Sequence, residues 1–323
     1  MSTASYRLID YSLRPGKYAE RKMLVEAFSR LKSFGDLSSY QYIGFGSIWF
    51  SDCILIHKAL GIGDLVSIEQ EKDHEARFNF NKPFGGIALR MGHSAEVLPS
   101  LDWSRRSIVW LDYDDPLNTG ILDDVRTVSS RISSGSALAV SVQAEKIFAP
   151  GVDGADNLHV DDGEKFLNYF GPDRTPPEIG PPDLRGWTLS ATSRKVILQE
   201  IRSALAVVNA TRNPGNHMEF RPVSAFEYAD GAKMTTICGV FIDVGQRGHF
   251  ESCNFASLPF VKADQSACRI EVPLITPREM RHLDLSLPVR PGVALQNGSV
   301  PGRDARLYSE LYRYLPNFAS FEV

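Results

Sequence analysis

The sequence has few cysteines and no long apolar run. Four cysteines in 323 residues, none of them in a C-x-x-C pair, do not make the framework of a disulfide-rich secreted domain, so we expect reduced thiols. No apolar run approaches the roughly 18 residues of a membrane helix, and the first residues lack the apolar core of a secretory signal. These absences predict a cytoplasmic protein that does not cross a membrane.

An excess of basic residues is also missing. The chain holds 35 Lys and Arg against 39 Asp and Glu, which disfavours nucleic acid and anionic membranes as general partners. A local basic groove is still compatible with this balance, because seven basic and three acidic residues fall within residues 1–34.

Several catalytic signatures are absent as well. The seven histidines show no metal-ligand spacing, so no metal site is expected. Neither a P-loop nor a G-x-S-x-G elbow occurs, which leaves nucleoside-triphosphatase and serine-hydrolase functions without support.

The sequence does contain short β-rich runs that alternate with helical patterns. Their recurrence every 20 to 30 residues is typical of strand–helix units that feed a parallel sheet. The predicted strands span residues 40–45, 64–69, 86–91, 107–112 and 136–142. Two further strands, 220–228 and 234–243, are joined through Asp230-Gly231, a strong hairpin signal. We therefore predict an α/β fold, a doubly wound (Rossmann-like), mostly parallel seven-stranded sheet that ends in an antiparallel hairpin.

The same patterns divide the chain into three regions. Residues 1–37 form an N-terminal helical arm, with apolar residues at helical spacing over 20–32. Residues 38–248 form the main domain, with a loop-like insertion at 145–189 and a long helix at 190–209. Residues 249–323 form a small C-terminal appendage with a helix opened by Thr276-Pro277 and a last helix near 303–315.

Candidate site residues follow the predicted strands, because ligands of doubly wound sheets bind beyond the carboxyl ends of the strands. The first strand ends in Gly44-Phe45-Gly46-Ser47, where glycines allow the backbone to approach a ligand closely. Trp49 stands where a dinucleotide fingerprint needs a third glycine, so a nicotinamide or flavin site is disfavoured.

Acidic residues end the second and fourth strands. Glu69, followed by Gln70, can accept hydrogen bonds from both hydroxyls of a ribose; alternatively it is a solvated acid in the charged run that follows. The fourth strand ends in Asp112-Tyr113-Asp114-Asp115, carboxylates that repel one another unless a cation lies nearby. Asp115 is equally compatible with a turn.

Taken together, these residues resemble the class I S-adenosylmethionine-dependent methyltransferases over about residues 40–245. Gly44-Phe45-Gly46 is similar to the glycine motif of that family, Glu69 to its ribose-binding acid, Gly92-His93-Ser94 to the start of its adenine-lining segment, and Asp112 to Pro116 to its motif after the fourth strand. The sequence resembles most closely the bacterial proteins described as "putative O-methyltransferases".

The sequence also departs from the family pattern at two places. His93 replaces an acid that commonly contacts the adenine amino group. Asp115-Pro116-Leu117 lacks the second proline and the aromatic residue of methyltransferases that act on nucleic-acid amines.

The resemblance implies an enzyme that transfers a methyl group from S-adenosyl-L-methionine to an oxygen of an unidentified acceptor, a small molecule or another compound. Two alternatives stay open: a nucleic-acid methyltransferase whose arm contacts phosphate, and a catalytically silent cofactor-binding scaffold. The oligomeric state is not predicted.

The expected site combines these motifs with two cations of the arm. Arg14 and Lys17 flank Pro15-Gly16, which we interpret as a loop that reaches the carboxylates or the cofactor's own carboxylate; the alternative is a solvated basic surface. The expected catalytic residues are Asp112 and Asp114. The expected cofactor-binding residues are Arg14, Lys17, Gly44, Phe45, Gly46, Ser47, Glu69, Gln70, His93, Ser94, Asp112 and Tyr113.

Overall fold

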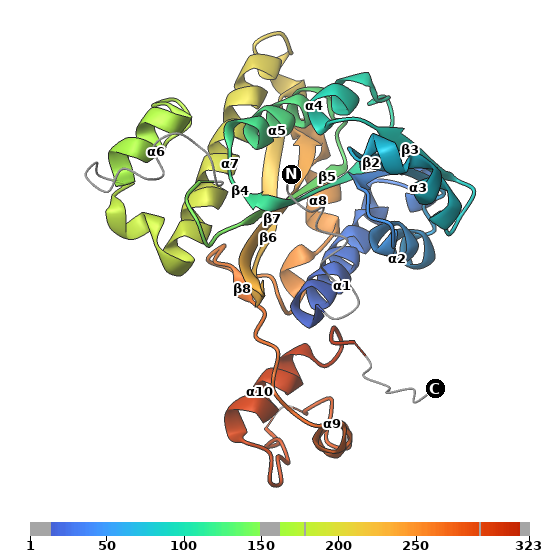
Figure 1. Ribbon diagram of the computed structural model, residues 1–323, viewed down its shortest axis with the longest axis vertical. Helices are drawn as coiled ribbons and strands as arrows, with labels where there is room; N and C mark the ends of the chain where they lie inside the picture. Colours follow the sequence, from blue (N-terminus) through green and yellow to red (C-terminus); the bar gives the residue numbers. More distant parts are fainter. Residues whose placement is uncertain (1–13, 149–161, 178, 291, 317–323) are drawn as a thin grey trace.

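The sheet of eight strands forms the centre of the molecule. A computed structural model describes residues 14–148, 162–177, 179–290 and 292–316 (Figure 1), and the strand order across the sheet is β3-β2-β1-β4-β5-β7-β6-β8. The strands are β1 (Gln41–Phe45), β2 (Asp64–Glu69), β3 (Ile87–Met91), β4 (Ser107–Pro116), β5 (Ser136–Gln143), β6 (Met218–Asp230), β7 (Ala232–Asp243) and β8 (Cys268–Arg269).

The predicted sheet is confirmed and gains one strand. Strands β1 to β5 pair in parallel, and β7 runs antiparallel to both β5 and β6. The added strand, β8, comes from the C-terminal region and pairs in parallel with the outer edge of β6. The hairpin turn is tighter than expected, with Gly231 at a φ of 104° that favours glycine.

Helices cover both faces of the sheet and make two cores. One core holds side chains of α1 (Pro15–Ser29), α2 (Ser51–Leu60) and α3 (Glu75–Asn81), joined by α8 (Arg247–Ser252), α9 (Pro277–Asp284) and α10 (Gly302–Leu311). The other core holds side chains of α4 (Ser94–Val97), α5 (Thr119–Arg131), α6 (Asp162–Phe170) and α7 (Gly186–Asn209). Figure 1 shows α9 and α10 at one end of the molecule and α6 at its side.

Successive side chains of each strand point to opposite faces of the sheet and therefore lie alternately in the two cores. Tyr42 and Trp110 face α1, whereas Ile43 and Val109 face the layer of α5 and α7. No helix within the described residues is long and apolar enough to span a bilayer.

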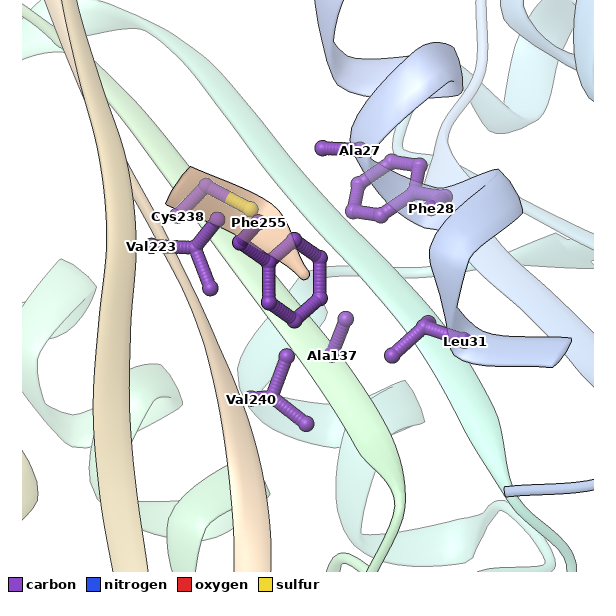
Figure 2. A pocket seen from close by; sticks show the side chains of 8 residues that line it. All are labelled: Ala27, Phe28, Leu31, Ala137, Val223, Cys238, Val240 and Phe255. Carbon is purple, nitrogen blue, oxygen red and sulfur yellow. The ribbon is translucent and has the colours of Figure 1, made fainter. Parts of the chain in front are cut away.

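A small gap lies between α1 and the sheet (Figure 2). Phe28 of α1, Leu31 of the 3-10 turn that follows α1, and Phe255 point toward it, over Ala137 of β5 and Val240 of β7. The gap has only apolar and thiol side chains around it and leaves no room for a water molecule. It is therefore part of the core, and no group there could orient a ligand.

Four local expectations are corrected by the structure. Helix α1 begins at Pro15 rather than near Glu20, because proline fits the first helical position, whose N–H would have no helical partner anyway. Strand β4 continues to Pro116 with an irregular register after Asp112. The segment 145–189 contains a helix, α6, and α7 starts at Gly186. The part of that segment at 149–161 lies outside the described residues.

The C-terminal region packs on the N-terminal helix. Helix α9 opens with the expected Thr276, whose side chain accepts from the Glu279 N–H while the Glu279 carboxylate accepts from the Thr276 N–H. Beyond α10, the Tyr314 hydroxyl donates to Glu26 Oε2 of α1 at 2.5 Å. The division into arm, main domain and appendage stays a prediction.

Candidate functional site

The glycine turn after β1 lies directly against the end of β2. The Gly46 N–H donates to the Ile68 carbonyl at 2.6 Å. A Cβ on Gly46 would lie 2.7 Å from Ser67 Oγ, closer than a Cβ contact allows, and 3.2 Å from Glu69 Oε2, a tight contact. The glycine is therefore required by close approach to the buried end of β2.

Glu69 has one carboxylate oxygen in use and one facing the turn. Its Oε1 accepts from the backbone N–H groups of Gln70 at 3.0 Å and Glu71 at 3.4 Å. Its Oε2 faces Gly46 and accepts no hydrogen bond within the described residues. Burial raises the pKa of Glu69 to about 7, an effect that the two N–H donors reduce. The side chain is 9% exposed, so Oε2 is an acceptor at the edge of the core.

A second contact joins the ends of β1 and β4. The Phe45 and Tyr113 rings meet edge-on with centroids 4.8 Å apart. The Tyr113 hydroxyl donates to Asp124 Oδ2 at 2.7 Å, and the Ser94 hydroxyl donates to the same oxygen. The start of α4 is thereby tied to β4 through Asp124 of α5.

Asp124 is a site residue that sequence reasoning missed. It is buried, and burial raises its pKa. The helical spacing could have found it, because position 124 lies on the same stripe of α5 as the buried Ile121 and Val128.

Lys17 lies on the other face of the sheet, beneath Asp112. Its Nζ is 2.5 Å from Asp112 Oδ1 and 2.8 Å from Glu20 Oε2, and it lies 4.5 Å from the centroid of the Trp110 ring. Lys17 is 2% exposed. Burial by itself lowers the pKa of Lys17, but Asp112 and Glu20 outweigh burial and raise that pKa well above its ordinary value. Lys17 therefore contacts Asp112, and a helix rather than the expected loop brings it there; its role in binding the cofactor stays a prediction.

Glu20 extends this ion pair into a buried polar network. It is fully buried, and its Oε1 accepts from the Thr236 hydroxyl of β7. Thr236 is 2.7 Å from the Ser141 hydroxyl of β5, which in turn accepts from Trp110 Nε1 at 2.9 Å. Burial raises the pKa of Glu20, and the Lys17 ammonium works against that rise. Glu20 was not expected at the site; the three-residue spacing from Lys17 marks it once α1 starts at Pro15.

The remaining predicted residues lie along the same edge of the sheet. Gln70, His93 and Asp114 are exposed, and Arg14 and Ser47 are half-buried. The Gly92 N–H, next to His93, donates to the Glu69 carbonyl at 2.9 Å, so the ends of β2 and β3 adjoin. The described residues contain no group of three or more His, Cys, Asp or Glu side chains arranged for a metal ion.

A family model matches nearly the whole chain. Residues 9–323 match the family described as "Putative O-methyltransferase". The chain belongs to this family. The predicted methyltransferase is thereby confirmed, and its acceptor is not identified by the match.

Three solved structures are distantly similar to this chain. Trm1 from Pyrococcus horikoshii, with S-adenosyl-L-methionine, is 11% identical with a TM-score of 0.45, and the match covers 74% of this chain and 58% of that one. The O-methyltransferase TomG from Streptomyces achromogenes, with the same compound, is 16% identical with a TM-score of 0.35, and the match covers 72% of this chain and 90% of that one. The O-methyltransferase from Bacillus cereus, in complex with S-adenosylhomocysteine, is 12% identical with a TM-score of 0.36, and the match covers 73% of this chain and 86% of that one. This chain thus spans little more than half of the Pyrococcus protein. A comparison with curated proteins gives no match.

Proposed function

We propose that this O-methyltransferase family member binds S-adenosylmethionine across the carboxyl ends of β1, β2 and β4. The observation that carries the proposal is the contact between Gly46 and Glu69. Glu69 Oε2 accepts no hydrogen bond within the described residues and lies beside the Gly46 turn, which a Cβ at position 46 would crowd. A free carboxylate oxygen in this place can accept hydrogen bonds from the two hydroxyl groups of a ribose.

Other residues of the edge fit the rest of the donor. Phe45 and Tyr113 present aromatic surface for the adenine, with His93 and Ser94 at the neighbouring start of α4. Gly44 accommodates the buried Tyr42 hydroxyl, which a Cβ at this position would overlap, and it stays a candidate through its place in the turn. Arg14, Ser47 and Gln70 stay candidates for contacts with the donor.

Asp112 is the residue we assign to the acceptor's hydroxyl group. When bound, S-adenosylmethionine supplies an electrophilic methyl carbon: its bond to sulfur breaks with the electron pair left on sulfur, while the acceptor oxygen bonds to the carbon and loses its proton. Lys17 holds Asp112 by Oδ1, which leaves Oδ2 to orient the hydroxyl and take the proton. Asp114, further along β4 and exposed, is the second candidate for this role.

Calorimetric titration of S-adenosylmethionine and its demethylated product tests the donor site. Both are expected to bind, and NAD is expected to bind much more weakly. Glu69→Ala should weaken binding by about 1.5–3 kcal/mol for each charged hydrogen bond lost, and Gly46→Ala should weaken it by steric overlap. Glu71→Ala is the matched control, and equal affinities of the Glu69 and Glu71 variants would contradict the proposal.

Radiolabelled methyl transfer to cell extract distinguishes an enzyme from a silent scaffold. We expect labelling by the natural chain and its loss in Asp112→Ala with donor binding retained. If labelling persists in Asp112→Ala, Asp112 is not the proton acceptor, and another group such as Asp114 has that role.

Two basic residues of the N-terminal arm do not support the alternative of a nucleic-acid methyltransferase. Lys17 and Arg21 are buried in ion pairs with Asp112 and Asp52, so these two cations do not face phosphate. A cytoplasmic location is also part of the proposal, supported by the four unpaired cysteines, three of them buried.

A further inference from the structure

A pocket of about 370 Å³ lies beside the first turn of α1. Four parts of the chain line it: Pro15 at the start of α1, Trp187 in the first turn of α7, Tyr228 to Asp230 at the end of β6, and residues between Arg269 of the edge strand β8 and Leu274. Its volume falls within the range of roughly 300–1,000 Å³ that is usual for small-molecule sites.

The pocket lies at the same edge of the sheet as the candidate donor site, and buried side chains lie between it and Asp112. The tip of the β6–β7 hairpin lies at the carboxyl edge of the sheet, since Met234 pairs with Gln143 at the end of β5. The Tyr228 ring, which lines the pocket, is 5.7 Å from Lys17 Nζ, and that ammonium binds Asp112. Tyr228 and Lys17 thus connect the wall of the pocket to the carboxylate assigned to the hydroxyl group.

The charged residues of the pocket wall are already paired. Arg269 donates to Glu227 Oε2 at 2.7 Å, Glu271 binds Arg303 at 2.8 Å, and Asp230 accepts the first N–H groups of α1. An ionic ligand would have to compete with these partners, so the wall favours an uncharged one.

The rest of the wall is aromatic and aliphatic. Arg269 lies 4.4 Å from the centroid of the Trp187 ring, a contact that holds the indole in place. Leu274 is 93% exposed at the pocket, an apolar side chain without cover. Flat apolar surface beside a fixed indole suits a planar ring.

We propose that this pocket holds the methyl acceptor and that the acceptor is an uncharged aromatic compound with a hydroxyl group. This inference rests on the proposed methyl transfer. It assigns substrate selection to the start of α7 and to the C-terminal region, in which Arg269 and Leu274 lie.

The probe for the test is 2-naphthol, titrated calorimetrically into the full chain saturated with S-adenosylhomocysteine; cyclohexanol is the non-aromatic comparison. We expect saturable binding of 2-naphthol, at least tenfold tighter than cyclohexanol. Leu274→Asp and Trp187→Ala should each weaken it at least tenfold. Leu285→Asp is the matched control, because Leu285 is 88% exposed in the same region and does not line the pocket; its affinity should be unchanged.

Binding of S-adenosylhomocysteine, measured for every variant, separates the two proposals and reports folding. If the natural chain binds it but does not bind 2-naphthol, or binds cyclohexanol as tightly, the acceptor proposal is overturned while the donor site stands. An unchanged affinity of Leu274→Asp for 2-naphthol also overturns the acceptor proposal. Because Leu274 is exposed, this variant should fold, and the test remains valid even if Trp187→Ala does not fold. If the natural chain fails to bind S-adenosylhomocysteine, the donor site and the inference built on it both fall.

Discussion

Glu69 combines two properties that oppose each other. Its ionised form is the better hydrogen-bond acceptor for ribose hydroxyls, whereas burial favours the protonated form and brings its pKa to about 7. The ordinary pKa of a glutamate is 4.5. Between about pH 4.5 and pH 7, Glu69 is therefore protonated in the folded chain and ionised in the unfolded chain. The contribution of Glu69 to stability therefore falls as the pH rises through that range.

Donor affinity should accordingly rise with pH. Between pH 5 and pH 8, the affinity for S-adenosylmethionine is expected to increase and to level off above pH 7, where Glu69 has lost its proton. Calorimetry across this range checks the profile. Glu69→Gln should flatten it and, at pH 8, should raise the free energy of unfolding by about 1–3 kcal/mol, since each pKa unit corresponds to about 1.4 kcal/mol. A profile unchanged in the glutamine variant would contradict this role.

Lys17 should be much more important to stability than a surface lysine. Lys17→Met leaves Glu20 buried without its cation, and breaking a buried pair typically costs about 3–5 kcal/mol. The double variant Lys17→Met, Glu20→Gln should recover part of that loss, because the uncompensated charge is gone. Urea unfolding of the single and double variants measures the coupling, and strictly additive losses would count against a buried ion pair.

The sequence indicates candidate site residues more readily than the partners that contact them. Glu69 and Asp112 could be found because an acid at the end of a parallel strand is a local pattern. Helical spacing indicates that Asp124 is buried, but its contact with Tyr113 and that of Thr236 with Glu20 form only after the sheet and its helices assemble. Pairings across such separations depend on packing, and local patterns do not encode them.

At the scale of elements, the tip of the β6–β7 hairpin supports the start of α1. The Asp230 carboxylate accepts from the N–H groups of Gly16 at 3.2 Å and Lys17 at 2.8 Å, which replaces the side-chain cap that Arg14 does not provide. Proline and glycine at positions 15 and 16 predict a loop because they interrupt regular helix. The cap that allows a helix to begin there comes from a residue more than 200 positions away.

Asp230→Ala should therefore destabilise the protein by about 0.5–2 kcal/mol, the usual value of a helix cap. Asp230→Asn keeps an acceptor and should lose less. Thermal unfolding of both variants checks the order, and equal losses would show that the carboxyl group does not act as a cap.

For the whole molecule, the charge distribution predicts no general affinity for nucleic acid. The formal net charge is −4, and Lys17 and Arg21 of the arm are buried. Titrations with tRNA and duplex DNA at several salt concentrations should show no salt-dependent binding. An affinity that falls linearly with the logarithm of salt concentration would revive the nucleic-acid alternative.

The proposed boundary between main domain and appendage can be tested by trypsin. The boundary at 248/249 falls within α8, whereas Lys262 lies in an exposed stretch before β8. We expect cleavage after Lys262 before cleavage after Arg247, because helical backbone resists a protease. The fragments should stay associated on gel filtration, since Leu283 and Leu311 of the C-terminal region lie in the same core as α1; separation of the fragments would indicate an independent appendage.

The contacts of α1 also determine when the site can form during synthesis. The helix leaves the ribosome well before the residues that bind it. Asp230, Thr236 and Tyr314 come 214, 216 and 288 residues after their respective partners Gly16, Glu20 and Glu26. Until they emerge, Lys17 and Glu20 have no buried place and stay in water. The strand ends that carry Gly46 and Glu69 are made long before. The growing chain therefore completes the proposed ribose-binding part of the site before Lys17 can take its place beneath Asp112, the residue proposed to face the methyl acceptor.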